Sequence, residues 1–286
     1  MSIMQTVLRS PRFEVVSHVC RHPRVDCGYS PGGEPARFIF TRRGAFGVHA
    51  GGRSCMARPG QAVLLRAGVE YRITHPDRDG CDCCTDVCMD ESVLAELGVA
   101  GRAGPACQAF GHDLAFQQIH VELLLGLRRG ALAGEADAAL LDLFDRLLQA
   151  RQPVRLRPAA LARRVARVEE AILARVGENL EVDALAALAG CSPFHLCRIF
   201  RAVTGLSLRQ FRLQQRLGAA LGRLGEGEDD LAALACDLGF YSHSHMTEAF
   251  RRALGRSPRQ LREDLRCSDL RHLRARLRAP SRAAAR

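Results

Sequence analysis

The feature that most constrains the fold of this chain is an internal repeat of fifty residues in its C-terminal part. Placing residues 188–211 over residues 238–261 aligns nine identical residues at one offset. In the numbering of the first copy these are Leu188, Ser192, His195, Phe200, Arg201, Gly205, Ser207, Arg209 and Gln210. So many identities at a single offset indicate two copies of one structural unit.

Each copy carries the signals of a helix–turn–helix unit. In the first copy, residues 182–189 predict a short helix that ends at Gly190. Ser192 caps a second helix, which has Pro193 at its first position and ends at Gly205.

The second copy repeats this pattern. Residues 231–238 predict its first helix, Gly239 the turn, Ser242 the cap of the second helix and Gly255 its end. A helix over residues 207–224 joins the copies and spans roughly 27 Å at 1.5 Å per residue. That length is comparable with the roughly 34 Å between successive major grooves on one face of DNA. The spacing therefore favours two DNA-reading units on one rigid connector.

The distribution of charge agrees with a polyanionic partner for this half. From residue 159 onward there are 22 arginines against 14 acidic residues, whereas residues 1–158 hold 19 against 17. The chain has no lysine, so codon bias could raise its arginine content, but such a bias would act on both halves alike. The basic excess of the second half therefore favours nucleic acid.

Residues 160–266 resemble the DNA-binding domain of the AraC/XylS family of bacterial transcriptional regulators. The resemblance rests on GCSPFHLCRIFRAVTGLSLRQFRLQQRL and on ACDLGFYSHSHMTEAFRRALGRSPRQLR, and it covers more than a third of the chain. It implies a sequence-specific regulator, expected to be an activator, with promoter DNA, RNA polymerase and a small effector as partners. The chain has no signal peptide and no run of eighteen apolar residues, so we expect it in the cytoplasm, at the nucleoid.

In the first copy, Phe194, Cys197 and Arg198 lie near the start of the second helix, where a recognition helix reads bases. The resemblance places base contacts at the same positions. Arg198 is the leading candidate because a guanidinium can bind guanine O6 and N7 together, the alternative being a solvated arginine. Phe194 is also a candidate for the core, with Ile199 and Phe200.

The corresponding candidates in the second copy are His243, Ser244, His245, Thr247 and Glu248. Glu248 could accept a hydrogen bond from cytosine N4 but would repel phosphate. For His245, phosphate contact or local packing is favoured over metal binding. Arg201 and Arg251 are the expected phosphate partners, with intrahelical pairing as the alternative.

The front half predicts β-structure. Short apolar runs such as 37–40 and 62–65 alternate with turn signals such as SPGGEP, RPG and HPDRDG, which is typical of a small barrel or sandwich. The resemblance implies a cupin-like β-barrel that binds an effector. The expected fold is α+β in two domains. Its segments are a barrel at 1–105, a helical hairpin for dimerisation or core at 106–150, a linker at 151–158, a double helix–turn–helix domain at 159–267 and a basic tail at 268–286.

A catalytic role for the front domain is disfavoured. A catalytic cupin would show a His-x-His pair, whereas the comparable run FGVHAG holds only His49, and no nucleophile constellation is evident. We therefore expect a protein that is not an enzyme.

The cysteines are the unusual feature of the front half. The stretch CDCCTDVCMD at 81–90 holds four thiols, and HVCRH at 18–22 holds a thiol between two imidazoles. The predicted metal or redox residues are Cys81, Cys83, Cys84 and Cys88, with His18, Cys20 and His22 as additional candidates. Such ligands suit zinc, copper(I), an iron–sulfur cluster or a mercury-like ion. The spacing matches no zinc-finger pattern, and inert packing of buried thiols is the alternative.

Three hypotheses follow. The leading one is a DNA-binding regulator whose cysteine-rich front domain senses a metal ion, a thiol-reactive agent or the redox state. The second is a regulator that responds to a small molecule and has passive cysteines. The third is a metal-storing or redox-enzymatic front domain fused to a DNA anchor.

Overall fold

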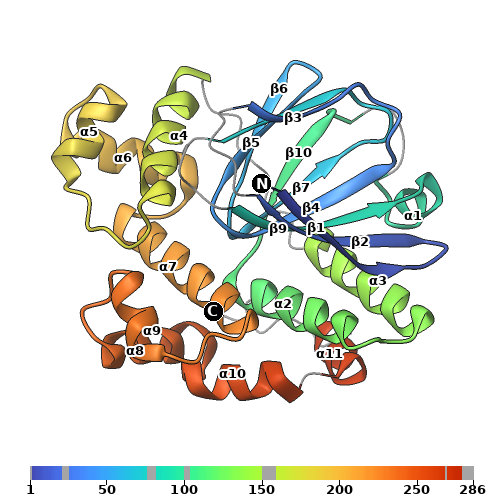
Figure 1. Cartoon of the computed structure of the whole chain (residues 1–286). Coiled ribbons are helices and arrows are strands. Elements are labelled where there is room, and N and C mark those ends of the chain that lie inside the picture. Colours follow the sequence, from blue (N-terminus) through green and yellow to red (C-terminus); the bar gives the residue numbers. More distant parts are fainter. Residues whose placement is uncertain are drawn as a thin grey trace.

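The computed structural model describes residues 2–20, 26–75, 82–99, 104–149, 159–267 and 269–278. The expected linker at 151–158 lies outside them. The chain mixes helices and sheets, as predicted, with the strands in the front half and a helical back half (Figure 1). None of the described helices is both long and apolar enough to cross a membrane.

The front domain contains two antiparallel sheets. The six-stranded sheet has the order β1-β2-β9-β4-β7-β10, and the four-stranded sheet has the order β3-β8-β5-β6. The strands are β1 Ser2–Arg9, β2 Phe13–Cys20, β3 Asp26–Ser30, β4 Ala36–Arg43, β5 Phe46–Ala50, β6 Arg53–Ala57, β7 Gln61–Leu65, β8 Tyr71–Thr74, β9 Asp82–Met89 and β10 Cys107–Gly111. No sheet closes on itself among the described residues, because the edge strands β1 and β10 do not pair with the edges of the smaller sheet. The expectation of a closed cupin-like barrel is therefore corrected to two sheets packed face to face.

Successive side chains of β4 point to opposite faces of the sheet and belong to two different hydrophobic cores. Phe38 and Phe40 face the helices, and the ring of Phe38 lies 4.7 Å from that of Phe144. Ile39, between them, faces the smaller sheet and packs with Val48. The six-stranded sheet is thus buried on both faces.

The helical hairpin is shorter than predicted and belongs to the core. The first residues of the predicted segment form β10, and the hairpin consists of α2 Leu114–Arg128 and α3 Ala133–Gln149. Twelve of the fifteen residues of α2 are buried. The structure thus supports the core alternative for α2. A dimer face on this hairpin would have to use the outer surface of α3. A short helix, α1 Glu91–Glu96, follows β9.

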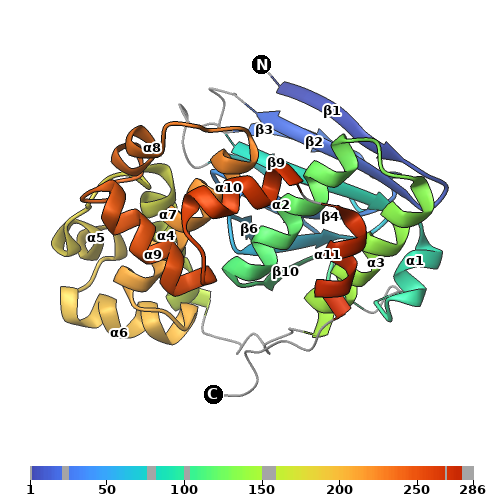
Figure 2. The ribbon, with the colours of Figure 1, turned by 90° about the horizontal axis from the view of Figure 1, so that it is seen from below.

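The described part of the expected basic tail is a helix, α11 Leu270–Arg278. Its leucines Leu270, Leu273 and Leu277 are buried against the hairpin of the front domain (Figure 2). Arg274 pairs with Asp142 of α3 at 3.0 Å. The end of the DNA-binding half therefore packs against the front domain.

The double helix–turn–helix is confirmed with nearly the predicted boundaries. Its helices are α4 Ala159–Ala174, α5 Val182–Ala189, α6 Pro193–Thr204, α7 Leu208–Gly225, α8 Leu231–Asp237, α9 His243–Leu254 and α10 Pro258–Cys267. Ser192 and Ser242 cap α6 and α9, and both helices end at a glycine with positive φ, Gly205 and Gly255. These local signals fix the unit because they satisfy helix ends that would otherwise lack hydrogen-bond partners.

The connecting helix α7 lies directly against α2 of the front domain. A Cβ at Gly218 would lie 2.8 Å from Gln117 Oε1, and one at Gly225 would lie 2.5 Å from Val121 Cγ1. Gln117 Nε2 donates to the Gly218 carbonyl at 3.0 Å. Only glycine permits this closeness, so the contact between the two halves is encoded in α7 itself.

A second bridge joins the front domain to the first helix–turn–helix unit. Arg58, between β6 and β7, pairs with Glu169 of α4 at 3.0 Å. The same guanidinium lies 4.9 Å above the Phe211 ring of α7. The front domain thus touches the connector and the first unit together.

The two reading units are also tied to each other through Arg216 in the middle of α7. Its guanidinium donates to the carbonyls of Val176 and Glu178 and to the side chain of Asn179, all before α5. It also donates to the Gly239 carbonyl between α8 and α9, at 2.7 Å. One buried side chain therefore sets the orientation of both units.

We predict that Arg216→Ala lowers the free energy of unfolding by about 2–4 kcal/mol, because four acceptors lose the charged donor that this buried side chain supplies. Arg209→Ala, an exposed change on the same helix, should stay within about 0.5 kcal/mol. Urea unfolding followed by circular dichroism measures both. Equal stabilities of the two variants would show that the loops hold without Arg216.

Candidate functional site

The N-terminal turns of α6 present the predicted reading residues of the first copy. Ser192 Oγ accepts from the His195 amide at 3.3 Å, which fixes the start of the helix. Phe194, Cys197 and Arg198 are all exposed, and Phe194 is 81% exposed. The three side chains are available to a groove of DNA.

The core alternative for Phe194 is wrong. The buried stripe of α6 consists of Leu196, Ile199 and Phe200, spaced by three and one residues. Phe194 precedes Leu196 by two residues, which is roughly 200° around an α-helix and so on the opposite side. An exposed phenylalanine here can contact thymine methyl groups.

Arg198 has one neighbour that orients it. Its Nη2 lies 3.2 Å from His195 Nδ1. Because no carboxylate pairs with Arg198 among the described residues, its charge is not neutralised within the protein. This exposure fits both the base-reading role and the solvated arginine that is its alternative, so the base-reading role stays a prediction.

In the second copy, α9 exposes His243, Ser244 and Glu248. Glu248 Oε1 accepts from Arg252 Nε at 2.9 Å, an exposed pair four residues apart. The pairing offsets the negative charge that was expected to weaken phosphate binding. Arg201 and Arg251 are exposed on the two helices, as phosphate partners need to be.

Two residues of this set behave differently. His245 lies edge-on to Phe240 and tilted against Tyr241, with ring centroids 5.6 and 5.4 Å away, and its Nδ1 accepts from the Tyr241 amide. His245 thus takes the local-packing alternative. Thr247 is half-buried with its hydroxyl turned inward, so the expectation that it is exposed is wrong.

Sequence reasoning missed Tyr241, which is 89% exposed beside the start of α9. Its signal was weak because the equivalent residue in the first copy is Cys191. A large aromatic ring at this place adds a hydrogen-bonding and stacking group to the second reading unit.

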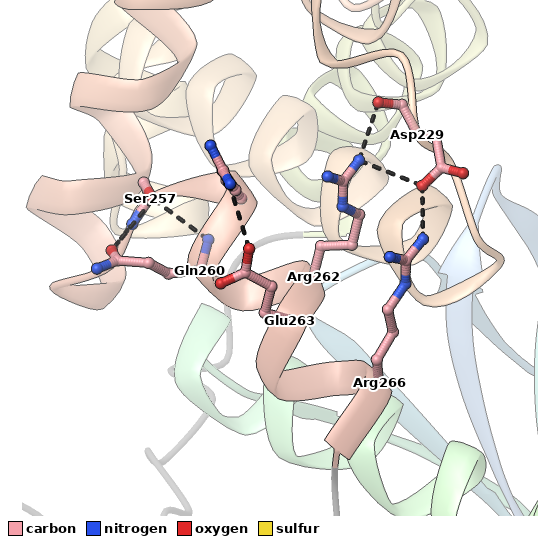
Figure 3. Close-up of polar contacts among 7 residues, drawn as sticks. Asp229, Ser257, Gln260, Arg262, Glu263 and Arg266 are labelled. Atoms are coloured by element: carbon pink, nitrogen blue, oxygen red, sulfur yellow. Dashed lines mark hydrogen bonds and ion pairs between the residues drawn. The ribbon is translucent and has the colours of Figure 1, made fainter.

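Several arginines of the basic half are used inside the protein. Arg262 and Arg266 of α10 both bind the Asp229 carboxylate, at 3.2 and 2.7 Å, and hold α10 to the segment before α8 (Figure 3). Ser257 and Gln260 cap the same helix reciprocally (Figure 3). The excess of arginine therefore overstates the charge available to DNA.

The four-cysteine stretch does not form one cluster. Cys81 and His22 lie outside the described residues, and from Asp82 onward the stretch is β9, in the middle of the larger sheet. Cys83 and Cys84 are both buried and, as neighbours in a strand, point to opposite faces. The cysteines were expected to act together in a loop, and the register of β9 separates them.

Burial weakens the case for reactivity at two of these thiols. Burial, and next the Asp86 carboxylate, raise the pKa of Cys84 well above its usual value. The same causes raise the pKa of Cys88 to about 12. A protonated thiol is a poor nucleophile and must lose its proton to bind a metal, so both residues fit the packing alternative on their own.

Two other candidates lie together with Cys84. His18 and Cys84 are register partners on β2 and β9, with Nδ1 and Sγ 3.8 Å apart. Cys20 lies two residues beyond His18, on the same face of β2. This face is the one turned toward the smaller sheet.

Comparisons with known proteins address the helical half. The family model of a helix-turn-helix domain matches residues 185–264. The regulatory protein SoxS of Salmonella typhimurium is 33% identical over 90 residues, which are 32% of this chain and 84% of SoxS. This chain belongs to the AraC family of transcriptional regulators.

Two further known proteins are similar to part of this chain. The probable transcription factor PqrA of Proteus vulgaris is 30% identical over 87 residues, 30% of this chain and 71% of PqrA. A solved structure of an AraC-type regulator from Chromobacterium violaceum is 23% identical and covers 38% of this chain and 96% of that one, with a TM-score of 0.35. The AraC-family chain is thus a DNA-binding regulator, and the role of its front domain rests on its own residues.

We predict that Arg198→Ala weakens binding to the cognate site by about 1–3 kcal/mol and relaxes preference at one base pair. Arg201→Ala is the matched control, because loss of a phosphate contact should weaken binding to cognate and random DNA alike. Fluorescence anisotropy titrations with both DNAs measure the difference. If Arg198→Ala weakens binding to cognate and random DNA equally, Arg198 contacts phosphate and does not read a base.

Proposed function

We propose that this AraC-family protein is a transcriptional activator whose front domain senses a thiophilic metal ion, a thiol-reactive agent or the redox state. The observation that carries the proposal is the contact of α2 with α7, supported by the thiols and imidazoles on the inner faces of the front domain. A regulator of this kind acts on promoter DNA and RNA polymerase in the cytoplasm.

The α2–α7 contact gives the signal a physical route. Helix α2 packs on the six-stranded sheet, and α7 sets the spacing of the two reading units. Arg42 of β4 and Arg128 of α2 both donate to Ser17 Oγ of β2, at 3.1 and 2.9 Å. A shift in the position of β2 or β9 would therefore be transmitted to α2 through these shared hydrogen bonds.

A signal can act only through a difference in affinity for two states. In the first state α7 is docked on α2, and in the second the docking is loosened. A contact of a few glycines and leucines is suited to this, because a ligand needs to shift the balance by only about 1–3 kcal/mol for a five- to 150-fold effect.

The activator role is tested by run-off transcription. Promoter fragments are first selected from genomic DNA by the purified protein, and purified RNA polymerase is then added with and without it. More transcript supports activation, and less transcript would make the protein a repressor. Sedimentation at the same protein concentrations tests whether the protein forms a homodimer.

We predict that Gly225→Val uncouples the signal from DNA binding, because the new side chain meets Val121 and separates α7 from α2. The variant should bind operator DNA but show an induction ratio close to one in a reporter assay. Gly134→Ala on α3, where a Cβ meets nothing within 4 Å, is the matched control. A wild-type induction ratio in Gly225→Val would contradict the route through α7.

One observation favours a second candidate, a small organic effector with passive cysteines. A cavity lies between the six-stranded sheet and the α2–α3 hairpin, lined among others by Val87, His120 and Leu140. Within the described chain, His120 Nε2 and Thr85 Oγ1 are buried and have no hydrogen-bond partner. The cavity measures about 10 Å³, room for one water molecule, so an effector would enter only if α2 or α3 moved outward, and it would then lie directly beneath α2.

His120→Leu distinguishes the two candidates. Burial holds the pKa of His120 well below its usual value, so it faces the cavity as a neutral imidazole. If an organic effector binds there, the variant should lose induction while keeping its thiol and metal chemistry. Induction that survives His120→Leu would remove this candidate.

A further inference from the structure

We propose that Cys20, His75 and Asp82 form a binding site for a thiophilic divalent cation, with zinc(II) as the ion whose ligand geometry they fit. The role of this site in receiving the signal rests on the proposed sensory function. The existence of the metal site itself is argued from geometry alone. Sequence reasoning named Cys20 as a candidate ligand, favoured a solvated loop charge over a partner of the ligands for Asp82, and did not name His75.

The three residues come from both sheets. Cys20 ends β2 and is the register partner of Asp82, which begins β9, so their side chains lie beside each other on one face. His75 directly follows β8 of the smaller sheet. The site therefore lies where the two sheets face each other, and a cation bound there would tie them together.

The donor atoms lie close enough to share one cation. Cys20 Sγ lies 3.7 Å from His75 Nε2, and His75 Nδ1 lies 2.9 Å from Asp82 Oδ1. One donor atom from each residue can be chosen so that all three lie within 4.8 Å of one another. A tetrahedral zinc ion, about 2.3 Å from sulfur and 2.0–2.1 Å from nitrogen, would hold these two donors roughly 3.6 Å apart. The observed sulfur–nitrogen distance matches that value.

The hydrogen bond to Asp82 prepares the imidazole for this role. A carboxylate at Nδ1 favours the tautomer with its proton on Nδ1, which directs the Nε2 lone pair toward Cys20. Asp82 is thus a positioning residue for His75, and it can give an oxygen to the same cation only by leaving this hydrogen bond. Cys20, His75 and Asp82 are only 2, 6 and 5% exposed, so a cation bound there would be largely shielded from water.

The neighbouring pair extends the same chemistry. His18 and Cys84 lie one step along β2 and β9, on the face that carries Cys20 and Asp82. Same-face neighbours in a strand are about 7 Å apart, so this pair adjoins the site without sharing its ion. The mixed sulfur, nitrogen and oxygen donors favour zinc over magnesium or calcium, which prefer oxygen alone.

Binding must release one proton at neutral pH. The Cys20 S–H bond breaks, its electron pair forms the bond to zinc, and the proton passes to solvent. The imidazole contributes its Nε2 lone pair. Metal affinity should therefore rise with pH, about tenfold per pH unit where the Cys20 thiol is protonated.

The test uses the full chain, purified without oxygen and stripped with a chelator. Zinc chloride is titrated in competition with a chromophoric chelator, and cobalt(II) substitution reports sulfur ligation through its charge-transfer band. We expect one tight zinc ion per chain. Cys20→Ser and His75→Ala should bind at least 100-fold more weakly, and Asp82→Asn 10- to 100-fold more weakly.

Cys107→Ser is the matched control, because Cys107 is a buried thiol of the same inter-sheet core, away from the three residues. It should bind zinc like the unmodified chain. Thermal melts check the folding of each variant, and His75→Gln gives a milder change if His75→Ala does not fold. Binding that is absent in the unmodified chain, or unchanged in folded Cys20→Ser, overturns the site.

Two outcomes separate this site from the sensory function. Tight zinc binding that changes neither DNA affinity nor transcript yield keeps the site and overturns its role as a sensor. Regulated transcription without zinc binding overturns the site and leaves the regulator. Rapid alkylation of Cys20 by iodoacetamide that depends on His75, without zinc binding, would identify a reactive thiol instead and also overturn the metal site.

Discussion

Helix α7 is the element on which the rest of the structure depends, because three separate bodies are packed onto it. Its glycines admit α2 of the front domain, and Arg216 on the same helix holds the loops of both reading units. A buried guanidinium is costly to desolvate, and its five donors justify that cost only where several acceptors converge. Four acceptors do so here, which makes the relative orientation of the reading units a property of α7 rather than of loose loops.

This arrangement limits how a signal can reach DNA. The front domain reaches the first unit through α7 and α4. It reaches the second unit through apolar contacts of α2 with α9 and through the hydrogen bond from Arg129 to the Leu265 carbonyl of α10. Helix α11 is a further connection between the C-terminal half and the front domain, since its Leu273 is buried in the front-domain core. Loosening any one of these contacts changes the docked state without altering the residues that read bases.

The helical half could be predicted almost entirely from sequence, because its signals are local. Serine caps, glycine ends and the fifty-residue repeat act within a few residues, so the start of α6 at Pro193 and its end before Gly205 follow directly. The core alternative for Phe194 and the expected exposure of Thr247 were wrong, because exposure depends on which side of a helix meets its neighbours. The front half was less predictable, since strand pairing is non-local. The sequence CDCCTDVCMD does not reveal that β9 lies between β2 and β4 in the sheet. For that reason the expected four-cysteine cluster was wrong.

The same non-locality explains why the site of Cys20, His75 and Asp82 was invisible in the sequence: His75 is 55 residues from Cys20, and only β-sheet register and stacking bring them together. Its presence is hard to explain by stability. Burying a carboxylate, an imidazole and a thiol removes them from water, and apolar side chains of the same volume would fill the space between the sheets at less cost. Cys107, a thiol elsewhere in the same inter-sheet core, needs no such explanation, because it packs among apolar residues. An oriented imidazole between a thiol and a carboxylate is better explained by a ligand that uses all three donors.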